Sequence, residues 1–164
     1  FLFCCYAGMR YSDFTNLSKK NIVDINQETW LIYKSVKTGT EVRLPLYLLF
    51  AGKGIVILNK YRNNLEDFFR LRDNSNINKD LIIIAKLAGL SKKISFHTAR
   101  HTNATLLIYN GVNITTVQKL LGHKSVKTTQ VYTNIMDMTI VHDLEKIKQA
   151  ALGIKKKTDN SFNK

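Results

Sequence analysis

The hydrophobic positions of the first 45 residues change from a helical spacing to an alternating one. The apolar run "FLFCCYAG" predicts the end of a helix that closes at Gly8, and "RYSDFTNL" predicts a short second helix. The runs that follow are rich in β-branched and aromatic residues and are separated by polar or glycine-containing turns. They predict three short antiparallel strands over residues 22–26, 29–36 and 41–45, the last of which stops at Pro45.

From Tyr47 onward the apolar spacing becomes helical. One helix with a glycine-rich interruption is predicted over residues 47–61, and residues 64–76 form a polar, weakly patterned connector. Further helices are predicted from residue 77 to Gly89, from about 98 to 111, and over 114–121 between the N-cap Asn113 and the C-cap Gly122. Ser125 should cap the next helix, and an amphipathic last helix covers about 137–152. The predicted fold is therefore mainly α with one small three-stranded antiparallel sheet.

The length of 164 residues suits a single domain, which we place at residues 1–154, followed by a basic polar tail at 155–164. The chain has no initiator methionine and begins inside a helical pattern, so we expect it to be a fragment of a longer protein. Cys4 and Cys5 are adjacent and predict small core residues in a reducing compartment. No signal peptide or membrane-spanning run is visible, which predicts a cytoplasmic protein without a membrane partner.

Positive charge is concentrated in the second half of the chain. The sequence holds 25 Lys and Arg against 12 Asp and Glu, a net charge of +13, and it has no acidic residue between Leu81 and Met136. A solvated surface ordinarily mixes both signs, so this long acid-free segment favours contact with a polyanion over a generic basic surface.

The stretch "SFHTARHT" places His97, Arg100 and His101 on one helix face near its N-terminus. The two histidines have the spacing of a helical zinc pair, but Thr98 stands where a zinc protease needs Glu, and a third ligand is not obvious. The alternative is an anion site, in which the arginine fork, a histidine and helix N–H groups all donate. His101 could also be an ordinary core histidine.

Three further positions fit an anion site. His123 follows Gly122 at a corner between two helices, Arg10 follows the helix that ends at Gly8, and Asp13 lies one turn further on, where it can orient a basic group. Tyr132 comes nine residues after His123 among lysines and threonines. Taken alone, a tyrosine in that setting could be packing, a hydrogen-bond donor or a nucleophile.

Read in order, these residues form a distinctive series: Gly-Met-Arg-x-x-Asp, a β-hairpin with Lys37 at its turn, His-x-x-Arg-His-Thr, Leu-Gly-His, and the tyrosine. This series resembles the catalytic domain of the tyrosine recombinases, the phage-integrase family, over nearly the whole chain. "FLFCCYAGMRYSDFTNL" and the compact hairpin are most similar to integrases of mobile elements from the Bacteroides group. Asn103 departs from the family pattern, which usually has an aromatic or apolar residue there, so we expect altered local packing.

The resemblance implies cleavage and rejoining of double-stranded DNA at attachment sites through a covalent 3′-phosphotyrosine link, without a metal ion or a cofactor. Arg10 and Arg100 would bind the scissile phosphate, and Lys37, favoured over its neighbour Lys34, would protonate the departing 5′ oxygen. His97 would assist proton transfer, His123 would donate to a non-bridging oxygen, and Tyr132 would attack; Asp13 and His101 would support these groups. We expect the positive surroundings to lower the pKa of Tyr132 from its ordinary value of about 10. The lysines expected to contact DNA are Lys34, Lys92, Lys93, Lys124 and Lys127.

The resemblance also implies an assembly. A protein of this kind would be monomeric when free and tetrameric on DNA at the bacterial nucleoid, where each last helix docks on a neighbouring protomer; packing of that helix within its own chain is the alternative. Its relatives clamp DNA between this domain and an N-terminal core-binding domain that is absent from this sequence. Three rival functions remain open: a type IB topoisomerase, a DNA-binding protein without catalysis, and a metal-dependent nuclease.

Overall fold

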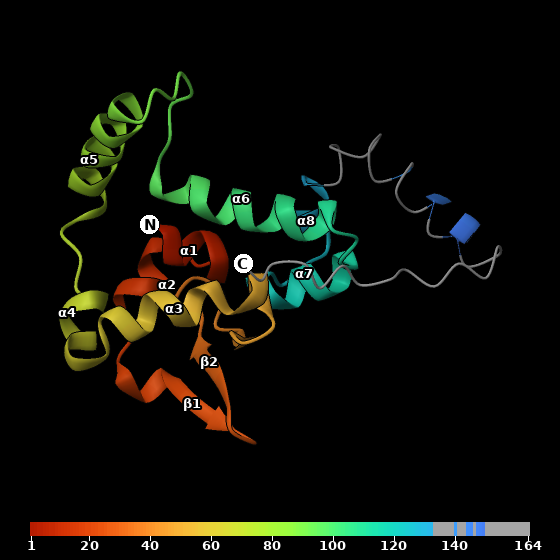
Figure 1. The fold of residues 1–164 in the computed structure, drawn as a ribbon, viewed down its shortest axis with the longest axis horizontal. Helices are drawn as coiled ribbons and strands as arrows, with labels where there is room; N and C mark the ends of the chain where they lie inside the picture. Colours follow the sequence, from red (N-terminus) through yellow and green to blue (C-terminus); the bar gives the residue numbers. More distant parts are fainter. Residues whose placement is uncertain (133–139, 141–143, 146, 150–164) are drawn as a thin grey trace, which may run out of the picture.

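The computed structural model describes residues 1–132, 140, 144–145 and 147–149, and it is mainly helical with one small sheet (Figure 1). The first part of the chain comprises α1 (Leu2–Ala7), α2 (Tyr11–Thr15), η1 (Lys19–Asn21), β1 (Ile22–Ile25), β2 (Glu28–Lys34) and β3 (Glu41–Pro45). The second part comprises η2 (Leu49–Gly52), α3 (Lys53–Lys60), η3 (Arg62–Asn64), α4 (Leu65–Phe69), α5 (Asn74–Leu87), α6 (Phe96–Tyr109), α7 (Ile114–Leu121) and α8 (Lys127–Gln130). The predicted fold class is confirmed.

The sheet has the order β1-β2-β3, with both pairs antiparallel. Leu31 of β2 pairs with Ile22 on one side and Leu44 on the other, and its side chain is buried in the core. The strand β2 ends at Lys34, two residues earlier than predicted, because residues 35–40 form a turn. In that turn the Ser35 N–H donates to the carbonyl of Thr40, and the Gly39 N–H donates to that of Ser35, both at 2.8 Å.

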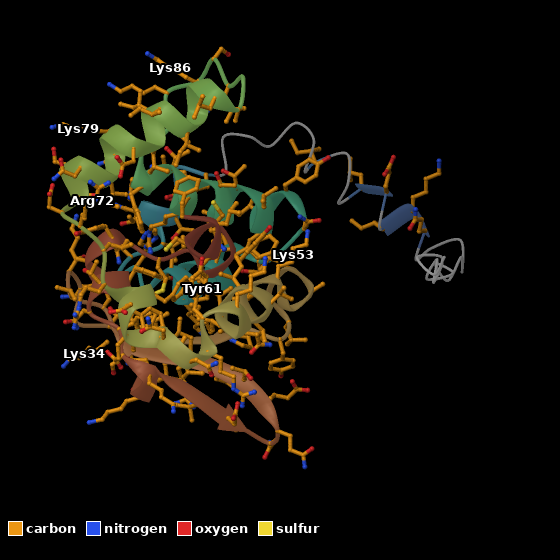
Figure 2. The ribbon with its side chains drawn as sticks, turned by 60° about the vertical axis from the view of Figure 1, so that its left-hand side comes forward. Lys34, Lys53, Tyr61, Arg72, Lys79 and Lys86 are labelled. Atoms are coloured by element: carbon orange, nitrogen blue, oxygen red, sulfur yellow. The ribbon has the colours of Figure 1, made fainter. Side chains whose placement is uncertain are left out.

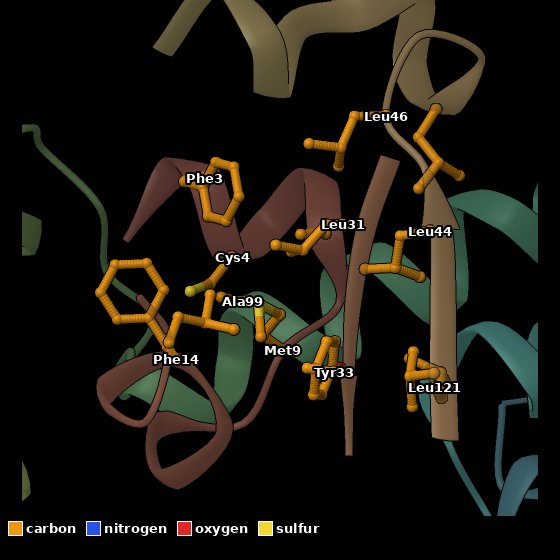
Figure 3. Close-up of a cluster of buried hydrophobic side chains, with 14 of the residues drawn as sticks. Phe3, Cys4, Met9, Phe14, Leu31, Tyr33, Leu44, Leu46, Ala99 and Leu121 are labelled. Atoms are coloured by element: carbon orange, nitrogen blue, oxygen red, sulfur yellow. The ribbon is translucent and has the colours of Figure 1, made fainter. Parts of the chain in front are cut away.

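Helix α1 is the centre of the core and packs against both α6 and α3 (Figure 1). Figure 3 shows its Phe3 and Cys4 among buried side chains from α2, β2, β3 and α6. Cys4 is buried and Cys5 is partly buried, and neither forms a disulfide, which confirms their expected role as core residues. The helix ends at Gly8, whose left-handed φ of 66° lets the chain turn sharply toward α2.

The prediction of a polar connector over residues 64–76 was only partly correct. It contains α4, whose Leu65 and Phe69 are buried, and Phe69 packs on the ring of Phe14 at a centroid distance of 5.5 Å. Helix α5 also begins at residue 74, earlier than predicted, because the side chain of Asp73 accepts a hydrogen bond from the Asn76 N–H. The predicted glycine-rich interruption is confirmed, since the backbone is left-handed from Phe50 to Gly52 before α3 starts.

The helices that carry the candidate site have clear caps. Ser95 and Thr98 form a capping box that starts α6 two residues before the predicted position, and Asn113 caps α7 through the Thr115 N–H as predicted. Ser125 accepts a hydrogen bond from the Lys127 N–H, although α8 starts one residue later than a Ser125 N-cap requires. Most of the predicted helix at 137–152 and the tail at 155–164 lie outside the described residues. None of the helices in the described part is long and apolar enough to traverse a lipid bilayer.

Candidate active site

Arg100 is the most deeply placed residue of the candidate site. It lies on α6 with 1% of its surface exposed, and its guanidinium donates to two backbone carbonyls: Nη1 to Gly8 at 2.8 Å and Nη2 to Leu121 at 2.6 Å. These two oxygens lie at the ends of α1 and α7. Arg100 therefore joins the C-terminal ends of two helices that are far apart in the sequence.

Arg10 lies at the N-cap of α2, directly after the turn at Gly8. Its Nη1 donates to the Ser35 hydroxyl at 3.2 Å and to Asp13 Oδ2 at 3.4 Å. Asp13 is buried and accepts the Val36 N–H at 2.8 Å together with the Ser35 hydroxyl. The expected role of Asp13 in orienting a basic group thus has a geometric basis, and Ser35 links this group to the hairpin turn.

The positive charge of Arg10 acts on Arg100. Burial, followed by the positive charge of Arg10, lowers the pKa of Arg100 to about 10. Tyr33 lies under the same cluster, where burial and the charge of Asp13 raise the pKa of its phenol. Among the described residues, the buried Tyr33 hydroxyl has no hydrogen-bond partner.

Lys37 lies in the turn between β2 and β3, and its side chain is exposed. The turn is tied to the corner before His123, because the Thr38 hydroxyl donates to the Gly122 carbonyl at 3.0 Å. The charge of Lys37 is also among the influences that lower the pKa of His97. The structure therefore places the predicted lysine within electrostatic reach of the predicted histidine.

His97 and His101 pack edge to face, with their ring centroids 4.4 Å apart. Both are exposed, and in both the pKa is lowered, first by desolvation and then by neighbouring positive charge: His101 and Arg100 act on His97, and Arg100 acts on His101. Within the described part of the chain, no third His, Cys, Asp or Glu completes a metal-binding group around them. The His101 ring lies 5.3 Å from that of Tyr132, so His101 belongs to the cluster rather than to the core.

His123 follows the left-handed Gly122 and is 7% exposed. Its Nδ1 lies 2.9 Å from the hydroxyl of Thr129, a fully buried residue of α8. Desolvation, followed by the charges of Arg100, Arg10 and His97, lowers the pKa of His123 to about 4. The imidazole is therefore neutral at physiological pH and carries a single ring proton.

Tyr132 is 7% exposed at the end of the turn that follows α8, where its N–H donates to the Thr129 carbonyl at 3.0 Å. The expected lowering of its pKa was wrong. Burial raises the pKa of the phenol, and the opposing influence of Arg100 and Arg10 is smaller. Burial favours the neutral form of an acid, and in this structure it outweighs the nearby positive charge.

The five lysines expected to contact DNA are all exposed: Lys34, Lys92, Lys93, Lys124 and Lys127. Figure 2 shows Lys34 extending from the sheet end of the molecule and Lys86 from the far end of α5. The structure thus leaves these charges accessible to a polyanion, although it brings none of the five into the cluster around Tyr132.

Sequence reasoning missed two polar residues that hold the site together, Ser35 and Thr129, and it gave Asn103 no polar role. Asn103 occupies the position that departs from the family pattern, and its Nδ2 donates to the carbonyls of Cys5 and Tyr6 at 3.1 and 2.9 Å. The altered packing expected at Asn103 is therefore a polar contact with the last turn of α1. No sequence signal marked Ser35 or Thr129, since both are common residue types in polar stretches.

Comparison with known proteins shows the family of this chain. A sequence profile described as the phage integrase family matches residues 1–138. This chain belongs to the phage integrase family. Its relatives in that family include the tyrosine recombinase XerC of Rickettsia prowazekii (strain Madrid E), 30% identical over 159 residues that cover 92% of this chain and 49% of the relative. A tyrosine recombinase of Pseudothermotoga lettingae is 44% identical over 149 residues, with 88% and 51% coverage.

The fold of this family member agrees with solved recombinase structures. A crystal structure of XerA recombinase superposes with a TM-score of 0.68 at 27% identity, covering 87% of this chain and 54% of that one. This chain spans about half the length of the curated relatives it matches.

Proposed function

We propose that this chain is the catalytic domain, residues 1–154, of a site-specific tyrosine recombinase that cleaves and rejoins double-stranded DNA. The supporting observation is the convergence of two arginines and a neutral histidine on one buried tyrosine. Arg100 and Arg10 act electrostatically on both Tyr132 and His123, and the contacts agree with this: Arg100 donates to the carbonyl of Leu121, two residues before His123, and the His101 ring lies 5.3 Å from that of Tyr132. Such a set of donors suits a phosphate that gains negative charge in its transition state.

In the proposed reaction, the Tyr132 oxygen attacks the scissile phosphorus while the bond to the 5′ oxygen breaks. The phenol proton leaves with the assistance of His97, and Lys37 supplies a proton to the departing 5′ oxygen. Arg10, Arg100 and His123 donate to the non-bridging oxygens. The 3′-phosphotyrosine link retains the energy of the phosphodiester, so that the 5′ hydroxyl can reverse the step without an external energy source. Because the pKa of Tyr132 is raised, the phenol stays protonated until it reacts, and its proton passes to a general base as the new O–P bond forms.

We further propose the kind of mobile genetic element that this protein serves and its assembly on DNA. The N-terminal segment and the compact hairpin support a mobile-element integrase of the Bacteroides type, acting on attachment sites at the bacterial nucleoid. The apolar spacing of Ile140, Leu144 and Ile147, all exposed, supports docking of the last helix on a neighbouring protomer in a DNA-bound tetramer. A type IB topoisomerase would share the cleavage chemistry but would not exchange partner strands.

The test is incubation with nicked duplexes that carry candidate attachment sites, in the presence of a chelator, followed by a denaturing gel. We expect a covalent protein–DNA band that disappears in Tyr132→Phe. Tyr109→Phe is the matched control, because Tyr109 is exposed at the end of α6 and should leave the band unchanged. A band that persists in Tyr132→Phe would place the nucleophile elsewhere. Cleaved strands that form only without chelator, and with no covalent band, would favour a metal nuclease.

A further inference from the structure

Thr129 lies between the two groups of the cluster that come last in the sequence, and neither composition nor spacing gave it a role. Its hydroxyl is 2.9 Å from His123 Nδ1, and its carbonyl oxygen accepts the Tyr132 N–H at 3.0 Å. The residue is fully buried, whereas the adjacent Thr128 is exposed. The side chain of Thr129 therefore holds the ring of His123, and its backbone oxygen holds the turn that carries Tyr132.

The direction of the Thr129–His123 hydrogen bond follows from counting donors and acceptors. A neutral imidazole carries one N–H, and a threonine hydroxyl has one proton to donate. Among the described residues, His123 Nδ1 is the hydroxyl's only partner. If Nδ1 carried the proton, the buried hydroxyl proton would be left without an acceptor, which is the costly arrangement for a buried polar group. If Nδ1 is bare, the hydroxyl donates to it and both atoms of this contact are satisfied, while the ring proton lies on Nε2.

We propose that Thr129 is a positioning residue that fixes the tautomer of His123, with its hydroxyl donating to Nδ1 and the ring proton held on Nε2. In the described part of the chain, Nε2 makes no hydrogen bond, so its proton stays available for an incoming acceptor. The charged groups that act on the ring are Arg100, Arg10 and His97. The consequence for catalysis rests on the proposed function, because an Nε2–H can donate to a phosphate oxygen and a bare Nε2 cannot.

The spectroscopic test needs no DNA and no activity. The full chain is labelled with ¹⁵N on histidine, and the ring nitrogens of His123 are observed by NMR near pH 7, with His123→Asn used to assign the signals. We expect a protonated nitrogen at Nε2 and an unprotonated one at Nδ1 in the wild type. Thr129→Val has the same shape without the hydroxyl, and it should produce a mixture of tautomers. Thr129→Ser should restore the single tautomer, and Thr128→Val is the matched control that should change nothing.

A wild-type ring protonated at Nδ1 would overturn the proposal, whatever the Thr129 variants do. An unchanged single tautomer in folded Thr129→Val would overturn it as well. Where DNA cleavage is established, we expect Thr129→Val to slow formation of the covalent complex by about tenfold or more at unchanged DNA affinity, and Thr129→Ser to recover most of the rate. The tautomer result stands by itself if the proposed cleavage is not found, so the two proposals fail separately.

Discussion

The hydroxyl of Thr38 donates a 3.0 Å hydrogen bond to the backbone carbonyl of Gly122, 84 positions further along the chain. This contact fastens the turn of the β2–β3 hairpin to the corner that precedes His123. The turn carries Lys37, so the bond sets the distance between a proposed proton donor and the phosphate-binding groups. This side chain thus adds a second connection between the hairpin turn and the helical part of the site, beside the bonds of Asp13 with Ser35 and Val36.

Thr38→Val should loosen this connection while leaving the fold intact. We expect the free energy of unfolding to fall by about 1 kcal/mol, the usual net contribution of one such hydrogen bond. Hydrogen exchange should accelerate at the Gly39 and Thr40 amides, and covalent complex formation should slow. Thr40→Val is the matched control, because the Thr40 hydroxyl makes no hydrogen bond among the described residues. Equal effects in both variants would show that the loss comes from the strand and not from the contact with Gly122.

Gly8 should tolerate substitution much less well than Gly89, although both have a left-handed backbone. A Cβ at Gly8, at a φ of +66°, would lie 2.6 Å from Asn103 Oδ1, whereas at Gly89, at a φ of +68°, nothing lies within 4 Å. In both alanine variants the left-handed backbone lowers the free energy of unfolding by about 1–2 kcal/mol. Gly8→Ala should lose about 1–3 kcal/mol more from overpacking. Chemical denaturation of the pair measures the difference, and equal losses would mean that Asn103 moves aside freely.

The two arginines should respond differently to replacement by lysine. Arg100→Lys leaves one amine to serve two buried carbonyls, so it should cost about 1–3 kcal/mol of stability for the unsatisfied oxygen. Arg10 is partly exposed, and its neighbour Asp13 keeps the bonds from Val36 and Ser35, so Arg10→Lys should change stability less. Both variants should slow cleavage by about 100-fold or more, because each loses a donor to the proposed transition state. A thermal melt combined with single-turnover cleavage separates the two effects.

The pH dependence of stability should contain a contribution from His123. Its pKa is about 4 in the folded protein against an ordinary value of 6.5, so the unfolded chain binds a proton at a higher pH than the folded one does. The stabilisation is complete above pH 6.5 and is lost as the pH falls toward 4. Denaturation curves at several pH values should therefore show a decline across this window that is shallower in His123→Asn. An identical slope in the variant would assign the decline to other groups.

The elements that the sequence predicted well are those with local signals. Gly8 and Gly122 end helices and Asn113 begins one, because each fulfils a backbone requirement that depends only on its own residue type. The helix α4 was missed because its burial depends on distant residues: the ring that packs on Phe69 belongs to Phe14, about fifty positions earlier. Local composition at residues 64–76 looks polar, and only the tertiary contact shows which side chains are covered.

For the site too, the sequence indicated which residues take part but not what surrounds them. Order, spacing and the family resemblance led to the choice of Arg10, Arg100, His123 and Tyr132, and the structure places the arginines within electrostatic reach of the other two. They could not show that Tyr132 is buried, and so the expected direction of its pKa shift was wrong. The sign depends on a balance between desolvation and nearby charge, which is a property of the packed structure.

The partners of Arg100 have a consequence for the energy of reaching a transition state. Its guanidinium is held by two neutral carbonyl oxygens, and among the described residues it forms no ion pair. An arriving anion therefore has no internal carboxylate to displace from this arginine, and the guanidinium has already lost its hydration through burial. In water, solvent dipoles would have to reorient as negative charge develops on the anion. In the protein, the donor groups are already oriented when the chain has folded.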